Sequence, residues 1–179
     1  SEKPLPKVEV VDLREELKAG NRSILSVQLQ ELMEDRLKKG QQMMLFINRR
    51  GVAGFVSCRA CGHVIKCPHC DVSLSQHGSG AATRLVCHYC GYTTIQPGLC
   101  PVCGSKYISG FKAGTQKIEQ VVKARFPQAR VLRMDMDTTR TKDGYEQILS
   151  AFSNHEADIL IGTQMIVKGH DFPGVTLVG

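Results

Sequence analysis

The sequence contains no long apolar run. No stretch approaches the roughly 18 consecutive apolar residues that a membrane-spanning helix needs. The opening residues, SEKPLPKVEV, lack the apolar core of a secretory signal. We therefore expect a cytoplasmic protein with no membrane partner, in a compartment that keeps thiols reduced.

Cysteine is absent from both ends of the chain and confined to its middle. Of the 179 residues, all eight cysteines fall between positions 58 and 103. The formal net charge of +6 assumes neutral thiols. Eight thiolates would add eight negative charges and two Zn²⁺ would return four positive ones, which leaves the loaded chain near +2. Net charge alone is thus weak evidence for nucleic-acid binding.

The region before the cysteines, residues 1–57, predicts a linker followed by one helix and one strand. Two prolines in residues 1–7 favour the linker. Apolar residues then recur at helical spacing from Leu25 to Leu37, and Gly40 predicts the end of this helix. The apolar run from Met43 to Ile47 is typical of a strand buried on both faces.

The region after the cysteines, residues 104–179, predicts alternating helices and strands. Helical spacing covers 118–126, ended by Pro127, and again 145–152. Short apolar runs predict strands at 131–134, 158–162 and 175–178. This alternation predicts an α/β fold with a mostly parallel sheet covered on both faces, interrupted by the segment 58–103.

The eight cysteines form four C-x-x-C pairs within that segment. Two such turns supply the tetrahedral set of four thiolates that Zn²⁺ prefers, so eight cysteines predict two closed, structural zinc sites. A segment with so few apolar residues depends on metal for its folding. The pairs are Cys58/Cys61, Cys67/Cys70, Cys87/Cys90 and Cys100/Cys103.

The spacing favours a nested pairing of these turns but leaves sequential and crossed pairings open. Sixteen residues separate Cys70 from Cys87, a separation found in zinc sites. The nested arrangement gives one site from Cys58, Cys61, Cys100 and Cys103 and a second from Cys67, Cys70, Cys87 and Cys90.

Disulfides are disfavoured in a reducing compartment, and redox-active C-x-x-C pairs usually occur singly. Four histidines in the segment have no assigned role: His63, His69, His77 and His88.

The flanking motifs resemble the PriA family of helicases that act in bacterial replication restart. The motifs are NRRG before the cysteines, then GTQ, MDMDTTR and GTQMIVKGHDFPG after them. The resemblance covers nearly the whole chain and implies that the α/β part is a portion of a second RecA-like helicase lobe, with a zinc-ribbon-like insert. It implies an ATP-dependent 3′-to-5′ DNA helicase that recognises stalled forks and starts primosome assembly. The partners implied are forked and single-stranded DNA, single-stranded DNA-binding protein and primosome proteins.

By the same resemblance, individual residues acquire expected roles. Those expected to contact the DNA backbone are Arg49, Arg50, Thr163 and Gln164. Gly169 and Asp171 would approach the nucleotide cleft. Each could instead be an ordinary surface or turn residue.

The sequence departs from a complete helicase. It has no G-x-x-x-x-G-K-[ST] phosphate loop and no D-E-x-H motif, so the groups that hold ATP and Mg²⁺ are absent. The arginine-rich motif of these helicases would lie beyond Gly179. We therefore expect a piece of a larger enzyme that hydrolyses no ATP by itself.

Two other classes of protein remain as alternatives. Chaperone-type zinc domains of the DnaJ class also nest four C-x-x-C pairs, but their repeats continue as C-x-G-x-G. Here a single glycine follows Cys61, Cys90 and Cys103, and Asp71 follows Cys70. A stand-alone zinc ribbon that binds nucleic acid or protein would be a gene of about this length.

Overall fold

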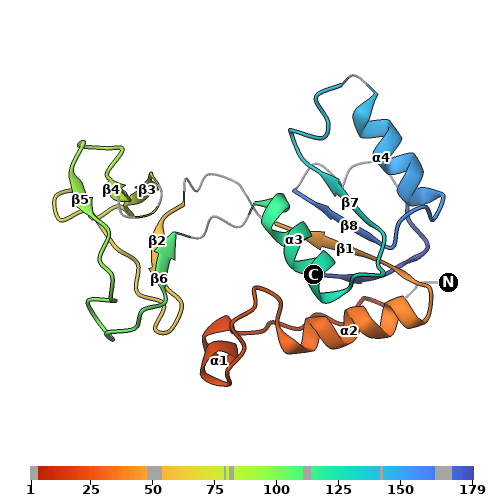
Figure 1. Cartoon of the computed structure of the whole chain (residues 1–179), viewed down its shortest axis with the longest axis horizontal. Helices are drawn as coiled ribbons and strands as arrows, with labels where there is room; N and C mark the ends of the chain where they lie inside the picture. Colours follow the sequence, from red (N-terminus) through yellow and green to blue (C-terminus); the bar gives the residue numbers. More distant parts are fainter. Residues whose placement is uncertain are drawn as a thin grey trace.

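The computed structural model describes residues 4–47, 54–78, 80, 83–110, 114–141, 143–163 and 171–179. These residues form a sheet domain and a separate Cys-rich module, which lie side by side in Figure 1. We define the Cys-rich module as the described residues between 54 and 110. None of the described helices is long and apolar enough to cross a membrane.

The sheet domain is built on four parallel strands. They follow the order β7-β8-β1-β9, with β8 and β9 both paired to β1 in parallel. The strands are β1 (Gln42–Phe46), β7 (Val131–Met134), β8 (Ile159–Gly162) and β9 (Val175–Val178). A parallel sheet with helices packed on its faces is the mixed α/β architecture that the sequence predicts.

Two helices cover one face of the sheet. Helix α2 (Val27–Lys38) begins where the Ser26 hydroxyl accepts a hydrogen bond from the Leu29 N–H, 3.1 Å away. Helix α3 (Thr115–Arg125) lies beside it (Figure 1). Their apolar sides meet alternate residues of β1 and β8 in one cluster. Its buried members are Leu25, Met33, Met43, Leu45, Ile47, Ile118, Val122, Phe126, Ile159 and Ile161.

Helix α4 (Gly144–Ser153) covers the opposite face. Leu149 and Phe152 from this helix pack against Met44 of β1, Met134 of β7 and Leu160 of β8. Met44 and Leu160 point away from the first cluster because successive side chains of a strand alternate between faces. The central strands are therefore buried on both sides, as continuous apolar runs predict.

The Cys-rich module contains two small antiparallel sheets. Strands β2 (Val56–Cys58) and β6 (Ile108–Gly110) form one, and β3 (Ser75–His77), β4 (Arg84–Val86) and β5 (Thr93–Ile95) form the other. Its small core contains four cysteines and only four other buried residues. These are Val56, Cys58, Cys67, Leu74, Leu85, Cys87, Cys100 and Ile108.

Most predicted elements of the sheet domain are confirmed, with small shifts at their ends. The strand at 131–134 has its predicted bounds, and Gly40 adopts a φ of 67° just after α2. Helix α1 (Leu13–Lys18) was not predicted, and it buries no residue. Strand β9 differs from the prediction of a buried strand, because it pairs only with β1 among the described strands and Val178 is 60% exposed.

Candidate metal centres

All four C-x-x-C pairs adopt the same tight turn. In each, the residue after the second cysteine donates its N–H to the carbonyl of the first cysteine, at 2.8–2.9 Å. The first cysteine donates its own N–H to the carbonyl two residues after the second cysteine, at 2.8 Å in every turn. The residue after the second cysteine has positive φ in every turn: Gly62, Asp71, Gly91 and Gly104. Glycine adopts this conformation without steric cost, which explains three of the four positions.

The turns bring eight sulfur atoms into two groups of four. Cys58, Cys61, Cys100 and Cys103 form one group, and Cys67, Cys70, Cys87 and Cys90 form the other. Within each group, all Sγ atoms lie within 4.8 Å of one another. The structure therefore groups the turns in the nested manner, with the second group enclosed in sequence by the first.

The sulfur spacing fits a tetrahedral metal ion. Four thiolates at about 2.3 Å from Zn²⁺ stand about 3.8 Å apart. The observed Sγ–Sγ distances are 3.6 Å for Cys58–Cys103, 3.7 Å for Cys61–Cys100 and 3.6 Å for Cys67–Cys90. These contacts are much longer than a disulfide bond of about 2.05 Å, and all eight cysteines are free. The donor set and its size both suit zinc.

Crowding the thiols together separates their pKa values. The backbone N–H of Cys90 stabilises the Cys87 thiolate and lowers the pKa of Cys87 to about 7. Hydrogen bonding with the Cys90 thiol, together with burial, raises the pKa of Cys70 to about 12. Four thiolates in one group at neutral pH therefore require a cation that compensates their mutual repulsion.

An arginine between two cysteines joins the Cys-rich module to the sheet domain. Arg59 donates from Nη1 to the carbonyl of Arg22, at 2.7 Å, and from Nη2 to those of Asn21 and Ser23, at 3.0 and 2.9 Å. Its backbone N–H donates to the carbonyl of Tyr107, at 2.9 Å, and the Arg22 guanidinium lies 5.8 Å from the Tyr107 ring centroid. The turn that Arg59 contacts leads directly into α2.

The histidines of the module lie outside both sulfur groups in the part of the chain that the structure describes. The His69 ring meets the Tyr92 ring edge-on, with centroids 5.4 Å apart. His63 contributes its backbone N–H to the Cys61 sulfur, at 3.4 Å. His77 and His88 contact each other.

The residues expected to contact DNA and nucleotide are only partly described. Thr163 is half-buried and directly follows β8, and Asp171 is exposed shortly before β9. Arg49, Arg50, Gln164 and Gly169 lie outside the described residues. Because parallel strands end at the same edge of a sheet, Thr163 shares an edge with the loop that follows β7.

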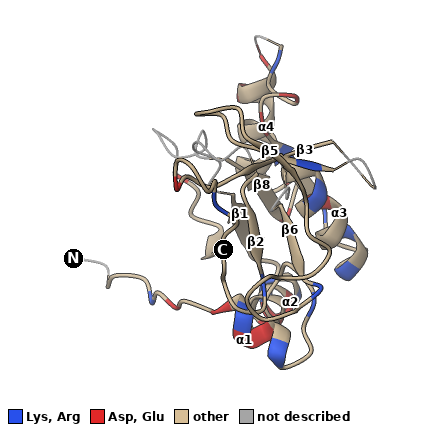
Figure 2. Cartoon of the chain, turned by 90° about the vertical axis from the view of Figure 1, so that its left-hand side faces the viewer, with Lys and Arg blue, Asp and Glu red and all other residues tan. Residues whose placement is uncertain are grey.

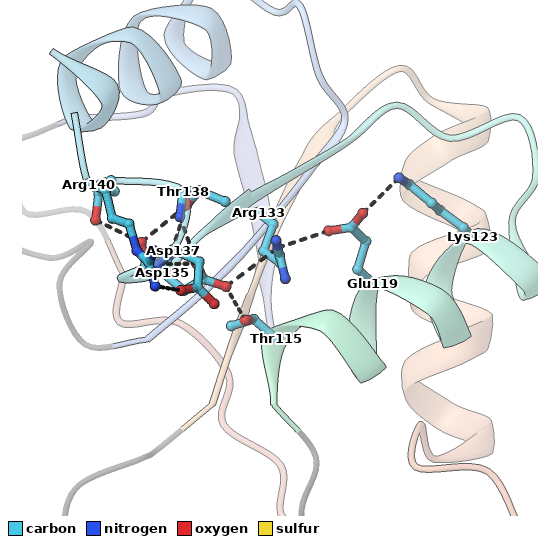
Figure 3. A network of polar contacts seen from close by, with 9 residues as sticks. Thr115, Glu119, Lys123, Arg133, Asp135, Asp137, Thr138 and Arg140 are labelled. Atoms are coloured by element: carbon cyan, nitrogen blue, oxygen red, sulfur yellow. Dashed lines mark hydrogen bonds and ion pairs between the residues drawn. The ribbon is translucent and has the colours of Figure 1, made fainter.

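That loop after β7 carries a polar network, drawn in Figure 3. One oxygen of Asp135 accepts the N–H groups of Asp137 and Thr138, at 2.9 and 3.0 Å. The other accepts the Thr115 hydroxyl and lies 3.4 Å from Nε of Arg133. Since Thr115 begins α3, the network fixes the start of this helix against the end of β7. The MDMDTTR motif thus has a structural role that its sequence did not indicate.

Charges elsewhere are mixed in sign. Figure 2 shows Lys and Arg beside Asp and Glu on α1. The described residues of the Cys-rich module include four cations, Arg59, Lys66, Arg84 and Lys106, and one acid, Asp71. With eight thiolates and two Zn²⁺, the described part of the module would carry a net charge near −1.

Comparison with known proteins connects this architecture to one family. Residues 67–94 match the PriA DNA helicase Cys-rich region (CRR) domain. The chain is 53% identical over 175 residues to the replication restart protein PriA of Bacillus subtilis, which is 98% of this chain and 22% of that protein. It is 51% identical over 180 residues to the PriA of Synechocystis, 99% of this chain and 22% of that protein.

A more distant relative covers less of the chain. The PriA of Haemophilus influenzae is 42% identical over 154 residues, 86% of this chain and 21% of that protein. In all three pairs, the chain spans roughly a fifth of the relative's length. The matches include the sheet domain and the Cys-rich module together, so this chain belongs to the PriA family of replication restart proteins.

Proposed function

We propose that this chain supplies the zinc module and part of the second motor lobe of an ATP-dependent 3′-to-5′ DNA helicase. The observation that carries the proposal is the identity of 53% over 175 residues with a replication restart protein. The whole protein would recognise stalled replication forks and start primosome assembly in the cytoplasm. Its partners would be forked and single-stranded DNA, single-stranded DNA-binding protein and primosome proteins.

The two sulfur groups each hold one structural Zn²⁺ in this proposal. Four cysteine ligands leave no open position for a catalytic water, so the metals serve folding and not chemistry. Half of the buried core of the Cys-rich module is cysteine, so metal binding supplies free energy that a larger apolar core would otherwise give. The insert comprises residues 58–103, and the ribbon of β2 and β6 connects it to its surroundings.

The rest of the chain, residues 1–57 and 104–179, contains the sheet domain and acts as part of a RecA-like lobe. Ligands of parallel α/β sheets bind beyond the carboxyl ends of the strands, which is the edge that Thr163 occupies. Thr163 and Gln164 contact the DNA backbone together with Arg49 and Arg50, and Gly169 and Asp171 approach the nucleotide. ATP and Mg²⁺ are held mainly by other parts of the protein, because this sequence has no phosphate loop.

The near-neutral net charge of the Cys-rich module favours binding through the shape of its surface over general attraction to DNA. A net charge near −1 gives little general attraction to phosphate, which is the main term in non-specific DNA binding. Two zinc ions hold the four turns rigidly, so the module can present fixed side chains to a fork or to a protein partner. Binding by the module alone would thus depend weakly on salt.

The test has two parts. The purified chain should hydrolyse no ATP with or without DNA. DNA-dependent ATP hydrolysis by the chain would refute the proposal that it holds only part of the motor. In the whole protein, Cys67→Ser should impair fork unwinding and partner loading more than ATP binding. Normal unwinding and loading by a Cys67→Ser protein shown to lack the zinc ion of that sulfur group would refute the role of the module.

A further inference from the structure

Two histidines distant in sequence meet on the surface of the Cys-rich module. His77 ends β3, and His88 lies in the third C-x-x-C turn. Their Nε2 atoms are 3.1 Å apart, and their rings meet at 68° with centroids 5.0 Å apart. Both side chains are exposed, so water can reach the point between the two nitrogens. Neither histidine belongs to a sulfur group.

The nitrogen separation suits two ligands of one metal ion. Imidazole nitrogen binds Zn²⁺ at 2.0–2.1 Å. Two nitrogens at that distance from one ion are about 3.3 Å apart at a tetrahedral angle and about 2.9 Å apart at a right angle. The observed 3.1 Å lies between these values. An ion could thus be bound with little movement of either ring.

We propose that His77 and His88 form a third divalent-metal site, distinct from the two sulfur groups. Imidazole ligands suit borderline ions such as Ni²⁺, Cu²⁺ and Zn²⁺. Two protein ligands leave the remaining coordination positions to water or to an oxygen donor of a bound partner. The ion is therefore exchangeable, unlike an ion enclosed by four thiolates.

The surroundings weaken this site and also provide a test of it. Arg84 pairs with His77 across β3 and β4, and directly opposed residues have side chains about 5 Å apart. Its positive charge opposes a bound cation, so Arg84→Gln should strengthen metal binding. A hydrogen bond between two neutral imidazoles would give the same nitrogen separation but no metal binding.

The experiment titrates the zinc-loaded chain with Ni²⁺ by calorimetry, with zinc content measured before and after. We expect one Ni²⁺ per chain in addition to two Zn²⁺, with no zinc released. His77→Ala and His88→Ala should each weaken Ni²⁺ binding by at least about tenfold. His69→Ala is the matched control, because His69 is also exposed and also lies between two cysteines of a turn; it should change nothing.

Three results would overturn the proposal: no Ni²⁺ binding, binding unchanged in the His77 and His88 variants, or binding matched by zinc release. The last would mean exchange within a sulfur group. A zinc content of two per chain shows that a variant has folded, which separates failure of this site from failure of the two zinc sites. If His88→Ala loses zinc, His77→Ala decides, since His77 lies outside the turns.

Discussion

Arg59 donates a hydrogen bond of 2.7 Å to the carbonyl oxygen of Arg22, although the two residues are 37 positions apart in sequence. The same guanidinium also reaches the carbonyls on both sides of Arg22. Asn21 shapes this turn from within, because its side chain donates to the Leu25 carbonyl at 2.9 Å and accepts the Ser23 N–H at 3.0 Å. One planar side chain thus joins a C-x-x-C turn to the turn that precedes α2.

Arg59→Ala should loosen this attachment without loss of metal. Charge-assisted hydrogen bonds contribute about 1.5–3 kcal/mol each, so amide exchange in residues 21–27 should rise by about tenfold or more. Arg59→Lys should restore only part of the protection, because an ammonium lacks the planar fork of donors.

Arg84→Ala is the matched control for that experiment, since Arg84 is an exposed arginine on the far sheet of the same module. It should leave exchange in residues 21–27 unchanged. Equal protection in Arg59→Ala and in the parent chain would show that the contact does not hold the module. Two zinc ions per chain in both variants would confirm that each module has folded.

The sequence predicts the sheet domain well because its signals are local. Apolar runs and helical spacing identify the buried strands and helices, and Gly40 marks the end of α2. Helix α1 has six residues and no buried side chain, so it presents no periodic pattern. The position of β9 at the end of the strand order, among the strands that the structure describes, is a property that no local pattern contains.

The contacts of the Cys-rich module are predicted less completely. The C-x-x-C spacing identifies the candidate sulfur ligands and favours their grouping, because each turn fixes two thiols locally. The contact of Arg59 with residues 21–23 joins distant parts of the chain through backbone carbonyls, which every residue has. The meeting of His77 with His88 depends on how the two strands align. Neither contact leaves a signal in a single sequence.

Replacing a single cysteine in one sulfur group should remove the zinc ion of that group and leave the zinc ion of the other. Cys58→Ser and Cys87→Ser each remove one buried thiolate from a different group, so each chain should retain one zinc ion. Exchange protection should fall in the module and persist in the sheet domain, whose two clusters contain no cysteine. Ser57→Ala, next to Cys58, serves as the control and should keep two zinc ions. Two ions in either cysteine variant would mean that the sulfur groups are not the ligands.

Asp71 is the one non-glycine residue at the positive-φ position of the four turns, with φ at 55°. A left-handed conformation costs a residue with a Cβ about 1 kcal/mol, and less for Asp than for most others. Asp71→Gly should therefore leave stability unchanged or raise it slightly, while Gly91→Val should lower it by at least about 1 kcal/mol. Chelator competition, read as the fraction of zinc retained at equilibrium, measures both. Weaker zinc retention by Asp71→Gly than by Gly91→Val would contradict the conformational explanation.

Asp135 should make the sheet domain sensitive to acid. Burial opposes its ionisation, but the Thr115 hydroxyl, the Thr138 N–H and the charge of Arg133 together lower the pKa of Asp135. A carboxylate with a lowered folded-state pKa stabilises the fold fully above its unfolded pKa of about 3.9, and this contribution is lost as pH falls through the folded value.

Asp135→Asn removes that charge and presents an amide N–H₂ group to Arg133 and Thr115, so it should cost about 1–3 kcal/mol at neutral pH. The difference from the parent chain should shrink once the medium is acidic enough to protonate Asp135. Urea unfolding of the zinc-loaded chain at neutral pH, followed by exchange or fluorescence probes in the sheet domain, measures the first effect. At acidic pH the zinc ligands protonate too, so the comparison needs probes in β7 and α3 alone.

Asp137→Asn is the control for this experiment. Asp137 is exposed, and among the described residues its side chain forms an ion pair only with Arg140. Equal destabilisation by the two substitutions at neutral pH would show that the network around Asp135 does not fix α3 to β7.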